Sequence, residues 1–257
     1  MPTLLNDKYY NEESVFLPEN LLREARRQRQ LKECSVPGIC VLDPDGDIVR
    51  YLRKHRAELN TCWACYHSEL YDARYKDLNF GIIGCVVGAS YAVLLAEQLF
   101  VSGCELLISI TSAGKLNESI KSDYILIKDT LRDEGTSYHY LHEEEESTLD
   151  LNALTKLQPL LSDKAFSVQT GKSWTTDAPY RETQSSILKA KALGADAVEM
   201  EASALYAFGK AKSKSIVCYA HLTNSMAQQH GDFEKGVENG SLTSLELIYQ
   251  TAKKLAS

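Results

Sequence analysis

Short runs of almost entirely apolar residues recur along this chain, and segments with helical spacing follow several of them. The clearest runs span residues 36–42, 105–110 and 215–222. Strands of this kind belong to a sheet that helices cover on both faces. The chain has 257 residues, of which 44% are hydrophobic, so it can bury one large core. We therefore predict an α/β fold with three layers, α/β/α, in which residues 36–257 form one domain.

A short helical segment precedes this core. Residues 18–30 start with Pro18, which suits the first turn of a helix, and they place Leu22 and Ala25 on one side. We predict that residues 1–35 form an N-terminal helical extension that packs onto the main domain. Within that domain we also predict a pair of strands at 62–69 and 79–87, joined by a charged turn at 71–77.

Charge and composition argue against several classes of partner. The formal net charge is −7, whereas phosphate backbones are bound by clustered Lys and Arg, so we expect no nucleic-acid partner. No apolar run reaches the roughly 20 residues that span a bilayer, and residues 1–13 lack the apolar core of a signal peptide. We expect a cytoplasmic protein without a membrane partner.

The seven cysteines lie within largely apolar segments. In a reducing compartment such side chains behave as small buried hydrophobic groups, and we expect them to be free. Cys62 and Cys65 have the spacing of a redox motif, but a strand-like stretch follows where such a motif needs a helix. We therefore do not expect redox chemistry.

Two glutamates flank one methionine at the junction of a strand-like and a helix-like segment. Glu199, Met200 and Glu201 occupy this junction. A half-buried carboxylate needs hydrogen-bond donors, and a polyhydroxylated ligand such as a sugar would supply several. The alternative is that Glu201 only favours the N-terminus of the following helix.

A second candidate site lies at the ends of two predicted strands. After residues 36–42, a turn that contains Gly46 opens into a helix with Arg50 in its first turn, which is a geometry suited to anions. The hydroxyls of Thr111 and Ser112 end another strand, at the edge where open α/β sheets hold ligands. Ordinary turn formation is the alternative for both groups.

Two further positions could contact a flat heterocycle. Tyr180 lies in the loop 173–183 and could stack on a base, although a loop with packed aromatic residues is the alternative. Asn224 follows the last predicted strand and can both donate and accept hydrogen bonds, but turn formation is its alternative. His139 and His142 lie beside the acidic run 143–146, which indicates a solvated loop rather than a metal site.

These segments, in this order, resemble the nucleoside phosphorylase family, which includes purine nucleoside phosphorylases, uridine phosphorylases and related nucleosidases. The stretch 199–202 resembles the ribose-binding signature of that family, and 46–50 resembles its phosphate turn, with Ile48 in place of the usual proline. The resemblance runs from Gly46 to Asn224 and implies a central mixed, partly barrel-like sheet. It also implies a homo-oligomer, from dimer to hexamer, that needs no metal or organic cofactor.

The resemblance assigns a role to each candidate residue. The phosphate ligands would be Gly46, Arg50, Thr111 and Ser112. The nucleoside ligands would be Tyr180, Glu199, Met200, Glu201 and Asn224, with a structural role as the alternative for Glu199. The catalytic residues would be Asn224, Glu201 and Arg50. The implied reaction is phosphorolysis of a 6-oxopurine nucleoside or of uridine, which gives ribose 1-phosphate and free base.

One departure from the family pattern leaves other functions open. Ser109 stands where the family usually has an arginine, so a bidentate phosphate contact is missing. One alternative is a nucleosidase, which uses water instead of phosphate, although such enzymes usually have an aspartate where Asn224 stands. The other alternative is a nucleoside sensor without catalysis.

Overall fold

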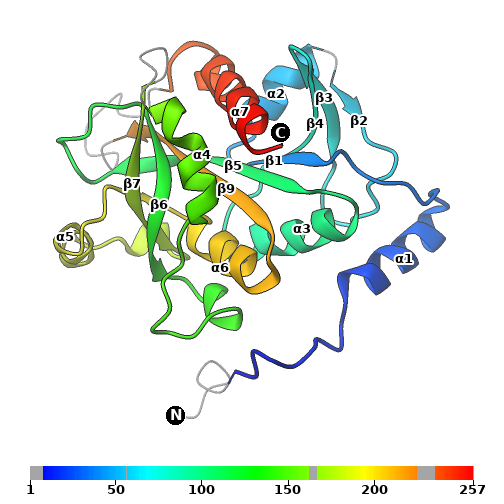
Figure 1. Cartoon of the computed structure of the whole chain (residues 1–257), viewed down its shortest axis with the longest axis horizontal. Coiled ribbons are helices and arrows are strands. Elements are labelled where there is room, and N and C mark those ends of the chain that lie inside the picture. The colour runs from blue at the N-terminus through cyan, green and yellow to red at the C-terminus, as the bar shows by residue number, and fades with distance from the viewer. Residues whose placement is uncertain (1–7, 56, 162–166, 225–234, 257) are drawn as a thin grey trace.

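The computed structural model describes residues 8–55, 57–161, 167–224 and 235–256 (Figure 1). Its strands are β1 (Ile39–Asp43), β2 (Glu58–Leu59), β3 (Tyr71–Tyr75), β4 (Leu78–Gly84), β5 (Leu106–Lys115), β6 (Tyr124–Asp133), β7 (Val168–Thr176), β8 (Ala197–Glu199) and β9 (Ser215–Asn224). Its α-helices are α1 (Pro18–Arg29), α2 (Asp47–Lys54), α3 (Ala89–Val101), α4 (Leu151–Leu161), α5 (Gln184–Ala192), α6 (Ala202–Lys212) and α7 (Ser241–Leu255). Short 3₁₀ turns span Ser137–His139, Pro179–Arg181 and Val237–Gly240.

The strands form one sheet, in the order β2-β3-β4-β1-β5-β8-β7-β6-β9, and β9 also pairs with β5. The second pairing closes β5, β8, β7, β6 and β9 into a barrel, because the last strand of the order returns to an inner one. Strand β5 is parallel to β1 and β9 but antiparallel to β8. The predicted α/β/α fold with a mixed, partly barrel-like sheet is confirmed.

Helices cover both faces of the sheet around its central strands. In Figure 1, α2 and α7 lie on one side of β1 and β5, whereas α3 and α6 lie on the other side. Strand β5 is buried along most of its length, as expected for a strand that packs on both faces. Large side chains such as Phe80, Phe208 and Tyr219 are fully buried between the layers.

The strand pair before α3 differs from the sequence-based prediction. No strand forms at residues 62–69, and the stretch predicted as a charged turn is mostly β3, which pairs antiparallel with β4. Tyr71 and Ala73 are buried in β3, whereas Asp72 and Arg74 are exposed. This alternation is the pattern of a half-buried strand, and the charges on its solvent face concealed it.

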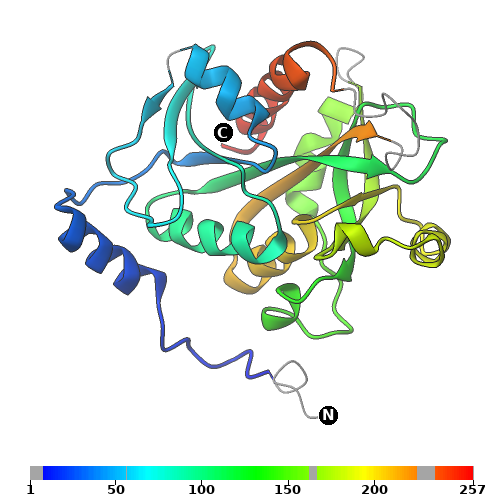
Figure 2. The same ribbon diagram turned by 180° about the vertical axis from the view of Figure 1, so that it is seen from behind.

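The N-terminal segment ends in a helix that lies at the periphery of the molecule (Figure 2). Leu22 and Ala25 of α1 are buried against Ala64. At the end of the helix, the Arg29 guanidinium donates hydrogen bonds to the carbonyl oxygens of Cys65, at 2.9 Å, and Ala64, at 3.3 Å. Helix α1 therefore packs on the loop that precedes β3, and it also contacts α3.

A disulfide bond joins Cys34, just after α1, to Cys62 in that loop, with 5.2 Å between their Cα atoms. The expectation that all seven cysteines are free is therefore wrong for this pair. The expectation that the cysteines are buried is wrong for Cys85, which is exposed. The remaining thiols, Cys40, Cys65, Cys104 and Cys218, are free and buried as expected.

Candidate active site

Closure of the sheet brings several strand ends together. Gly114 of β5 pairs with Val198 of β8 on one side and with Asn224 of β9 on the other. Because β8 runs antiparallel to β5, the chain that leaves β8 at Glu199 passes back along β5 toward Thr111. The predicted ribose signature, the hydroxyl pair and the strand-end amide therefore meet around β5, although they are far apart in the sequence.

Glu201, at the start of α6, is a nearly inaccessible carboxyl group with 2% of its surface exposed. Its Oε1 accepts a hydrogen bond from the Gly88 N–H at 2.7 Å, whereas its Oε2 has no partner among the residues that the structure describes. The Thr111 hydroxyl lies beside it but donates to the Ser112 carbonyl at 3.2 Å. Burial and the charge of Glu199 raise the pKa of Glu201 to about 8. This buried oxygen is suited to a ligand hydroxyl.

Glu199 is also buried, but the fold uses both of its oxygens. Its Oε2 accepts the backbone N–H groups of Glu201 and Ala202, each at 2.7 Å, and its Oε1 accepts the Thr175 hydroxyl. These bonds satisfy donors at the N-terminus of α6 and tie that helix to β7. Burial raises the pKa of Glu199. The arrangement corresponds to a positioning role for Glu199, which holds the neighbouring Glu201 in place.

The predicted phosphate turn has the expected backbone geometry. Asp43 at the end of β1 is buried, and its carboxylate accepts the N–H groups of Gly46 at 3.0 Å and Val49 at 2.9 Å. Burial raises the pKa of Asp43 to about 7. Gly46 precedes α2 with a φ of 75°, a left-handed conformation that favours glycine. The turn and the N-terminus of α2 thus form as the sequence predicts.

Two side chains that were expected to hold phosphate, Arg50 and Ser112, are bonded to carboxylates of the chain itself. The Arg50 guanidinium donates to the Asp45 carbonyl at 2.8 Å and to Asp47 Oδ1 at 2.6 Å. Ser112 donates both its backbone N–H, at 2.9 Å, and its hydroxyl to Asp45 Oδ2. Lys235 bridges the two aspartates, at 3.3 Å from Asp45 and 2.7 Å from Asp47. Neither Asp45 nor Lys235 was predicted as a site residue.

An open cleft of about 750 Å³ lies beside this turn, and its lining includes Gly46, Arg50, His67, Cys85 and Tyr91. Glu201 is not among the residues that line it. The structure thus groups Gly46 with Arg50, and Thr111 with Glu201. Asp45 connects the two groups, because its backbone carbonyl accepts a hydrogen bond from Arg50 and its carboxylate accepts the N–H of Ser112, the neighbour of Thr111.

The remaining predicted nucleoside ligands are Met200, expected at the sugar, and Tyr180 and Asn224, expected at the base. Met200 is partly buried beside Glu201. Asn224 is partly buried at the end of β9, where its amide donates to the Thr223 hydroxyl at 3.3 Å. Tyr180 is fully exposed on the 3₁₀ turn after β7, so the loop does not place its ring against another group. The roles of all three toward a nucleoside stay predictions.

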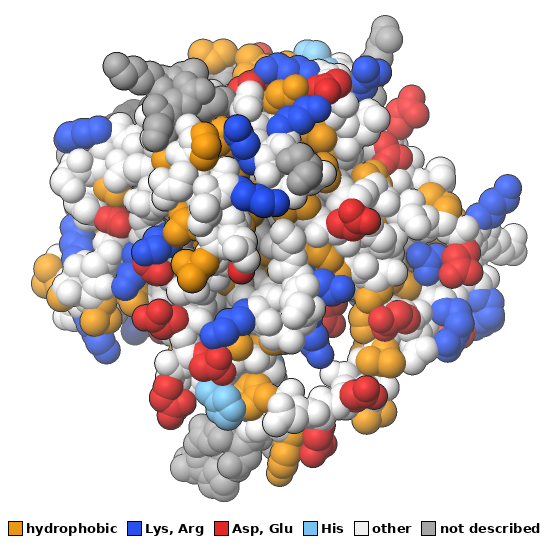
Figure 3. All heavy atoms as spheres, viewed as in Figure 1, with side chains coloured by type: hydrophobic (Ala, Val, Ile, Leu, Met, Phe, Trp, Pro, Cys, Tyr) orange, Lys and Arg blue, Asp and Glu red, His pale blue; other side chains and the backbone are white. Residues whose placement is uncertain are grey.

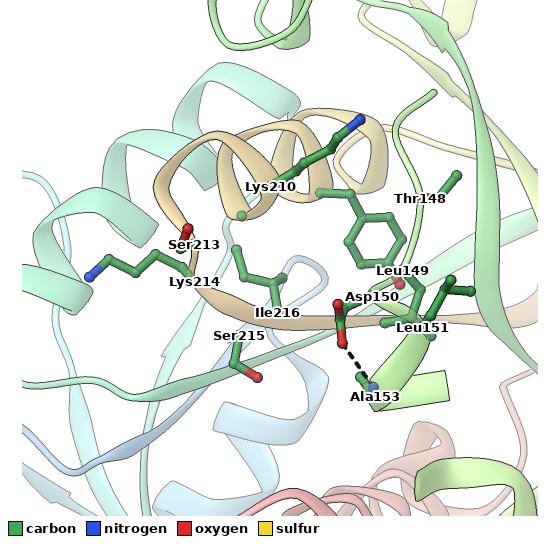
Figure 4. Close-up of a pocket in the computed structure, with 12 residues that line it drawn as sticks. Thr148, Leu149, Asp150, Leu151, Ala153, Lys210, Ser213, Lys214, Ser215 and Ile216 are labelled. Carbon is green, nitrogen blue, oxygen red and sulfur yellow. Dashed lines mark hydrogen bonds between the residues drawn. The ribbon is translucent and has the colours of Figure 1, made fainter. Parts of the chain in front are cut away.

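Other parts of the described surface offer no comparable group of residues. A cleft of about 560 Å³ lies where α4 begins and α6 ends, and Figure 4 shows Lys210 and Lys214 pointing away from each other there. In this cleft, Asp150 Oδ1 accepts a hydrogen bond from the Ala153 N–H at 3.0 Å, and Lys210 forms an ion pair with Glu145. Positive and negative side chains are interspersed over the face in Figure 3.

Within the described ranges, no cluster of three His, Cys, Asp or Glu side chains could hold a metal ion. No helix in these ranges is long and apolar enough to cross a bilayer.

Proteins of similar sequence include enzymes that act on nucleosides. The chain is 25% identical over 145 residues to the guanosine phosphorylase of Halorubrum lacusprofundi, which covers 56% of this chain and 60% of that protein. It is 27% identical over 135 residues to the DeoD-type purine nucleoside phosphorylase of Brevibacillus brevis, covering 51% and 57%. An uncharacterized protein of Acanthamoeba polyphaga mimivirus is 31% identical over 137 residues, 52% of each chain. The matches thus span little more than half the length of these curated relatives.

Solved structures of similar fold cover most of the chain. The uridine phosphorylase from Vibrio fischeri ES114 has a TM-score of 0.72 at 19% identity, over 88% of this chain and 94% of that one. The purine nucleoside phosphorylase from Toxoplasma gondii has a TM-score of 0.69 at 14% identity, over 86% and 90%. These likenesses establish the fold. A sequence profile of the phosphorylase superfamily matches residues 39–252, and the chain therefore belongs to the phosphorylase superfamily.

Proposed function

We propose that this chain is an enzyme that cleaves the N-glycosidic bond of a nucleoside. The observation that carries the proposal is the Glu201 carboxyl, which is buried and has an oxygen, Oε2, without a partner among the described residues. A buried polar atom of this kind costs free energy unless a ligand satisfies it. Two ribose hydroxyls, which both donate and accept, fit a carboxyl whose protonated and ionised forms are both accessible near pH 8.

The surrounding residues suit the chemistry of glycosidic bond cleavage. Met200 lies next to Glu201 and offers an apolar contact for one face of the sugar. As the bond to the base breaks, C1′ gains positive charge. This charge would favour the ionised form of Glu201, which would in turn stabilise it. Asn224 would donate a hydrogen bond to the departing base, which suits a 6-oxopurine because an amide has no proton to release at neutral pH.

The named relatives support the same class of substrate. One is called a guanosine phosphorylase and another a purine nucleoside phosphorylase. A structural neighbour is called a uridine phosphorylase. We propose a 6-oxopurine nucleoside first and uridine second. The acceptor of the sugar would be phosphate, as the sequence predicts, or water.

Base release by the purified chain tests the proposal. Guanosine, inosine and uridine are each incubated with the chain, with and without phosphate, and free base is measured by chromatography. We expect E201Q to lower kcat/KM by about 10- to 150-fold, since a hydrogen bond to a charged group contributes about 1.5–3 kcal/mol.

The exposed Glu144 supplies the control, because E144Q makes the same chemical change away from the site. It should retain the activity of the native chain. Binding of a nucleoside without release of base would identify a sensor instead. If no nucleoside is bound or cleaved, or if E201Q acts like E144Q, the proposal is wrong.

A further inference from the structure

The Asp45 carboxylate takes up the donors of Ser112, one of the residues that the sequence predicts to bind phosphate. Its Oδ2 accepts the Ser112 N–H at 2.9 Å and the Ser112 hydroxyl, and Lys235 Nζ lies 3.3 Å away. A backbone N–H, a hydroxyl and an ammonium group are the donors that a phosphate oxygen would need. Here they already bind an anion, and that anion is part of the chain.

Both cations at this turn are already paired with carboxylates of the chain. Arg50 pairs with Asp47, and Lys235 pairs with both Asp45 and Asp47. The Asp43 carboxyl lies in the same turn, and burial raises its pKa to about 7. Ser109 adds no charge at the position where an arginine would be expected from the family resemblance. A phosphate dianion would therefore meet cations that carboxylates already neutralise, and it would have to separate these carboxylates from their partners.

Competition also favours the internal carboxylate. Asp45 lies one residue before Gly46 in the turn, so its carboxylate is tethered beside Ser112. A tethered group has an effective concentration that a dissolved ion at millimolar concentration does not readily exceed. Phosphate binding would also have to offset the free energy lost when the ion pairs between Lys235 and the two aspartates break.

We infer that Asp45 replaces phosphate in this site and that water is the acceptor of the sugar, which makes the enzyme a hydrolase. This inference rests on the proposed cleavage of a nucleoside. The oxygen of water bonds to C1′, the bond from C1′ to the base nitrogen breaks, and its electron pair stays with the base. One water proton is transferred to the base, so the products are free ribose and free base.

The position of Asp45 relative to Glu201 is consistent with one shared site. Ser112, which binds Asp45, is adjacent to Thr111, which lies beside Glu201. The negative charge of Asp45 also contributes to the raised pKa of Glu201, so the two carboxyl groups are near enough to interact. Asp45 is thus a positioning residue at the edge of the sugar site that keeps an anion out of it.

The first experiment compares products. The native chain is assayed in phosphate-free buffer and with added phosphate, and the sugar product is identified as ribose or ribose 1-phosphate. We expect base and free ribose in equal amounts and the same rate in both buffers. Native activity that needs phosphate, with ribose 1-phosphate as its product, would overturn the inference while leaving the proposed cleavage intact.

A second measurement does not depend on catalysis. Phosphate is titrated into the native chain, D45A and D77A while Tm is followed, with sulfate at equal ionic strength as the reference ion. D77A removes an aspartate from a surface ion pair with Lys253 and is the matched control. We expect phosphate to raise Tm for D45A only, because only that variant frees the Ser112 donors and removes one of the two carboxylates that pair with Lys235. D45S serves if D45A does not fold.

D45A should also gain a dependence on phosphate in the assay. We expect added phosphate to raise its rate of base release by about tenfold, a factor equivalent to ~1.4 kcal/mol. Stabilisation of the native chain by phosphate, or D45A that behaves like D77A, overturns the inference. Absence of base release from any nucleoside would contradict the proposed function, and the Tm titration would then still decide whether Asp45 excludes phosphate.

Discussion

Glu199 and Glu201 are two residues apart, yet their environments give them different chemistry. Both are buried, but the N-terminus of α6 and the Thr175 hydroxyl satisfy Glu199, whereas Glu201 receives one described backbone donor. The sequence identifies the pair as unusual, because carboxylates rarely occur at the junction of two apolar segments. It cannot tell which of the two is free to bind a ligand, since that depends on donors contributed by Gly88 and Thr175.

The raised pKa of Glu201 predicts a pH dependence of stability. Its pKa is about 8 in the folded chain and 4.5 in the unfolded reference, so between these values the folded state holds one more proton. The free energy of unfolding should therefore fall as pH rises through this window, by at most about 1.4 kcal/mol per pH unit from this group. Its contribution is complete below the unfolded pKa and lost above the folded one.

Urea unfolding of the native chain and E201Q, from pH 5 to pH 9, measures this contribution. E201Q cannot ionise, so its stability should fall less steeply than that of the native chain over the same range. Asp43, whose pKa is also raised by burial, is present in both proteins and cancels in the difference. Equal slopes would show that Glu201 is ionised in the folded chain.

Asp45 shows what single-residue reasoning misses. The sequence presents it as one polar residue in a turn, between Asp43 and Gly46. Its bond to Ser112 spans 67 positions of the sequence, and its ion pair involves Lys235, which is farther away still. No local pattern reports such a contact. The absence of an arginine at Ser109 was the one available signal that the predicted phosphate site is unusual.

Among the structural elements, long apolar segments are predicted well and short mixed ones poorly. The strand Leu106–Lys115 begins close to the apolar run at 105–110, because its apolar character is continuous. Thr183 caps α5, since its hydroxyl accepts the Ser186 N–H at 3.2 Å. Strand β3 was wrongly predicted as a turn, because its charged residues alternate with buried ones.

The close approach of β4 to α2 gives a prediction about this packing. A Cβ atom at Gly84 would lie 2.9 Å from Val49 Cγ2 and 3.3 Å from the Gly46 Cα. Helix α2 and the turn at Gly46 would therefore have to shift. Because Val49 is β-branched and stiff, we expect G84A to destabilise the chain by about 1–3 kcal/mol.

Gly38 provides the control for this substitution. A Cβ atom there would have its nearest neighbour, Glu105 Oε2, at 3.8 Å, which is ordinary contact. G38A should therefore change the free energy of unfolding by no more than about 0.5 kcal/mol. Both variants are compared with the native chain by urea unfolding. If G84A is as stable as G38A, β4 and α2 do not pack as closely as described.

At the scale of the whole molecule, the fold class was predictable and the closure of the sheet was not. Apolar runs and the resemblance to a known family indicated a mixed sheet between helices. The pairing of β5 with β9, which closes the barrel, joins residues more than a hundred positions apart. Periodicity carries no information about such pairs. The division into an extension, 1–35, and a catalytic domain, 36–257, stays a prediction, as does a homo-oligomer.

The disulfide between Cys34 and Cys62 fastens the N-terminal extension to the main domain and predicts an effect of reducing agent. The two cysteines are 28 positions apart, so the cross-link should stabilise the chain by up to roughly 3–4 kcal/mol through the entropy of the unfolded state. We expect a reducing agent to lower the free energy of unfolding by an amount within this limit.

A double variant, C34S with C62S, is the control. It should be less stable than the oxidised native chain and insensitive to reducing agent, because it has no disulfide to lose. The measurement is urea unfolding of both proteins in oxidising and reducing buffers. A native chain whose stability does not change on reduction would show that the bond does not form or that it does not constrain the unfolded chain.

The distribution of thiols has a practical consequence. With Cys34 and Cys62 joined and four further cysteines buried, Cys85 is the one thiol that solvent reaches. It borders the cleft next to Arg50 and lies against Gly46. A maleimide dye or a nitroxide spin label would therefore attach at one site, Cys85, next to the turn at Gly46. Changes in its emission or mobility would report which molecules enter the cleft without any engineering of the chain.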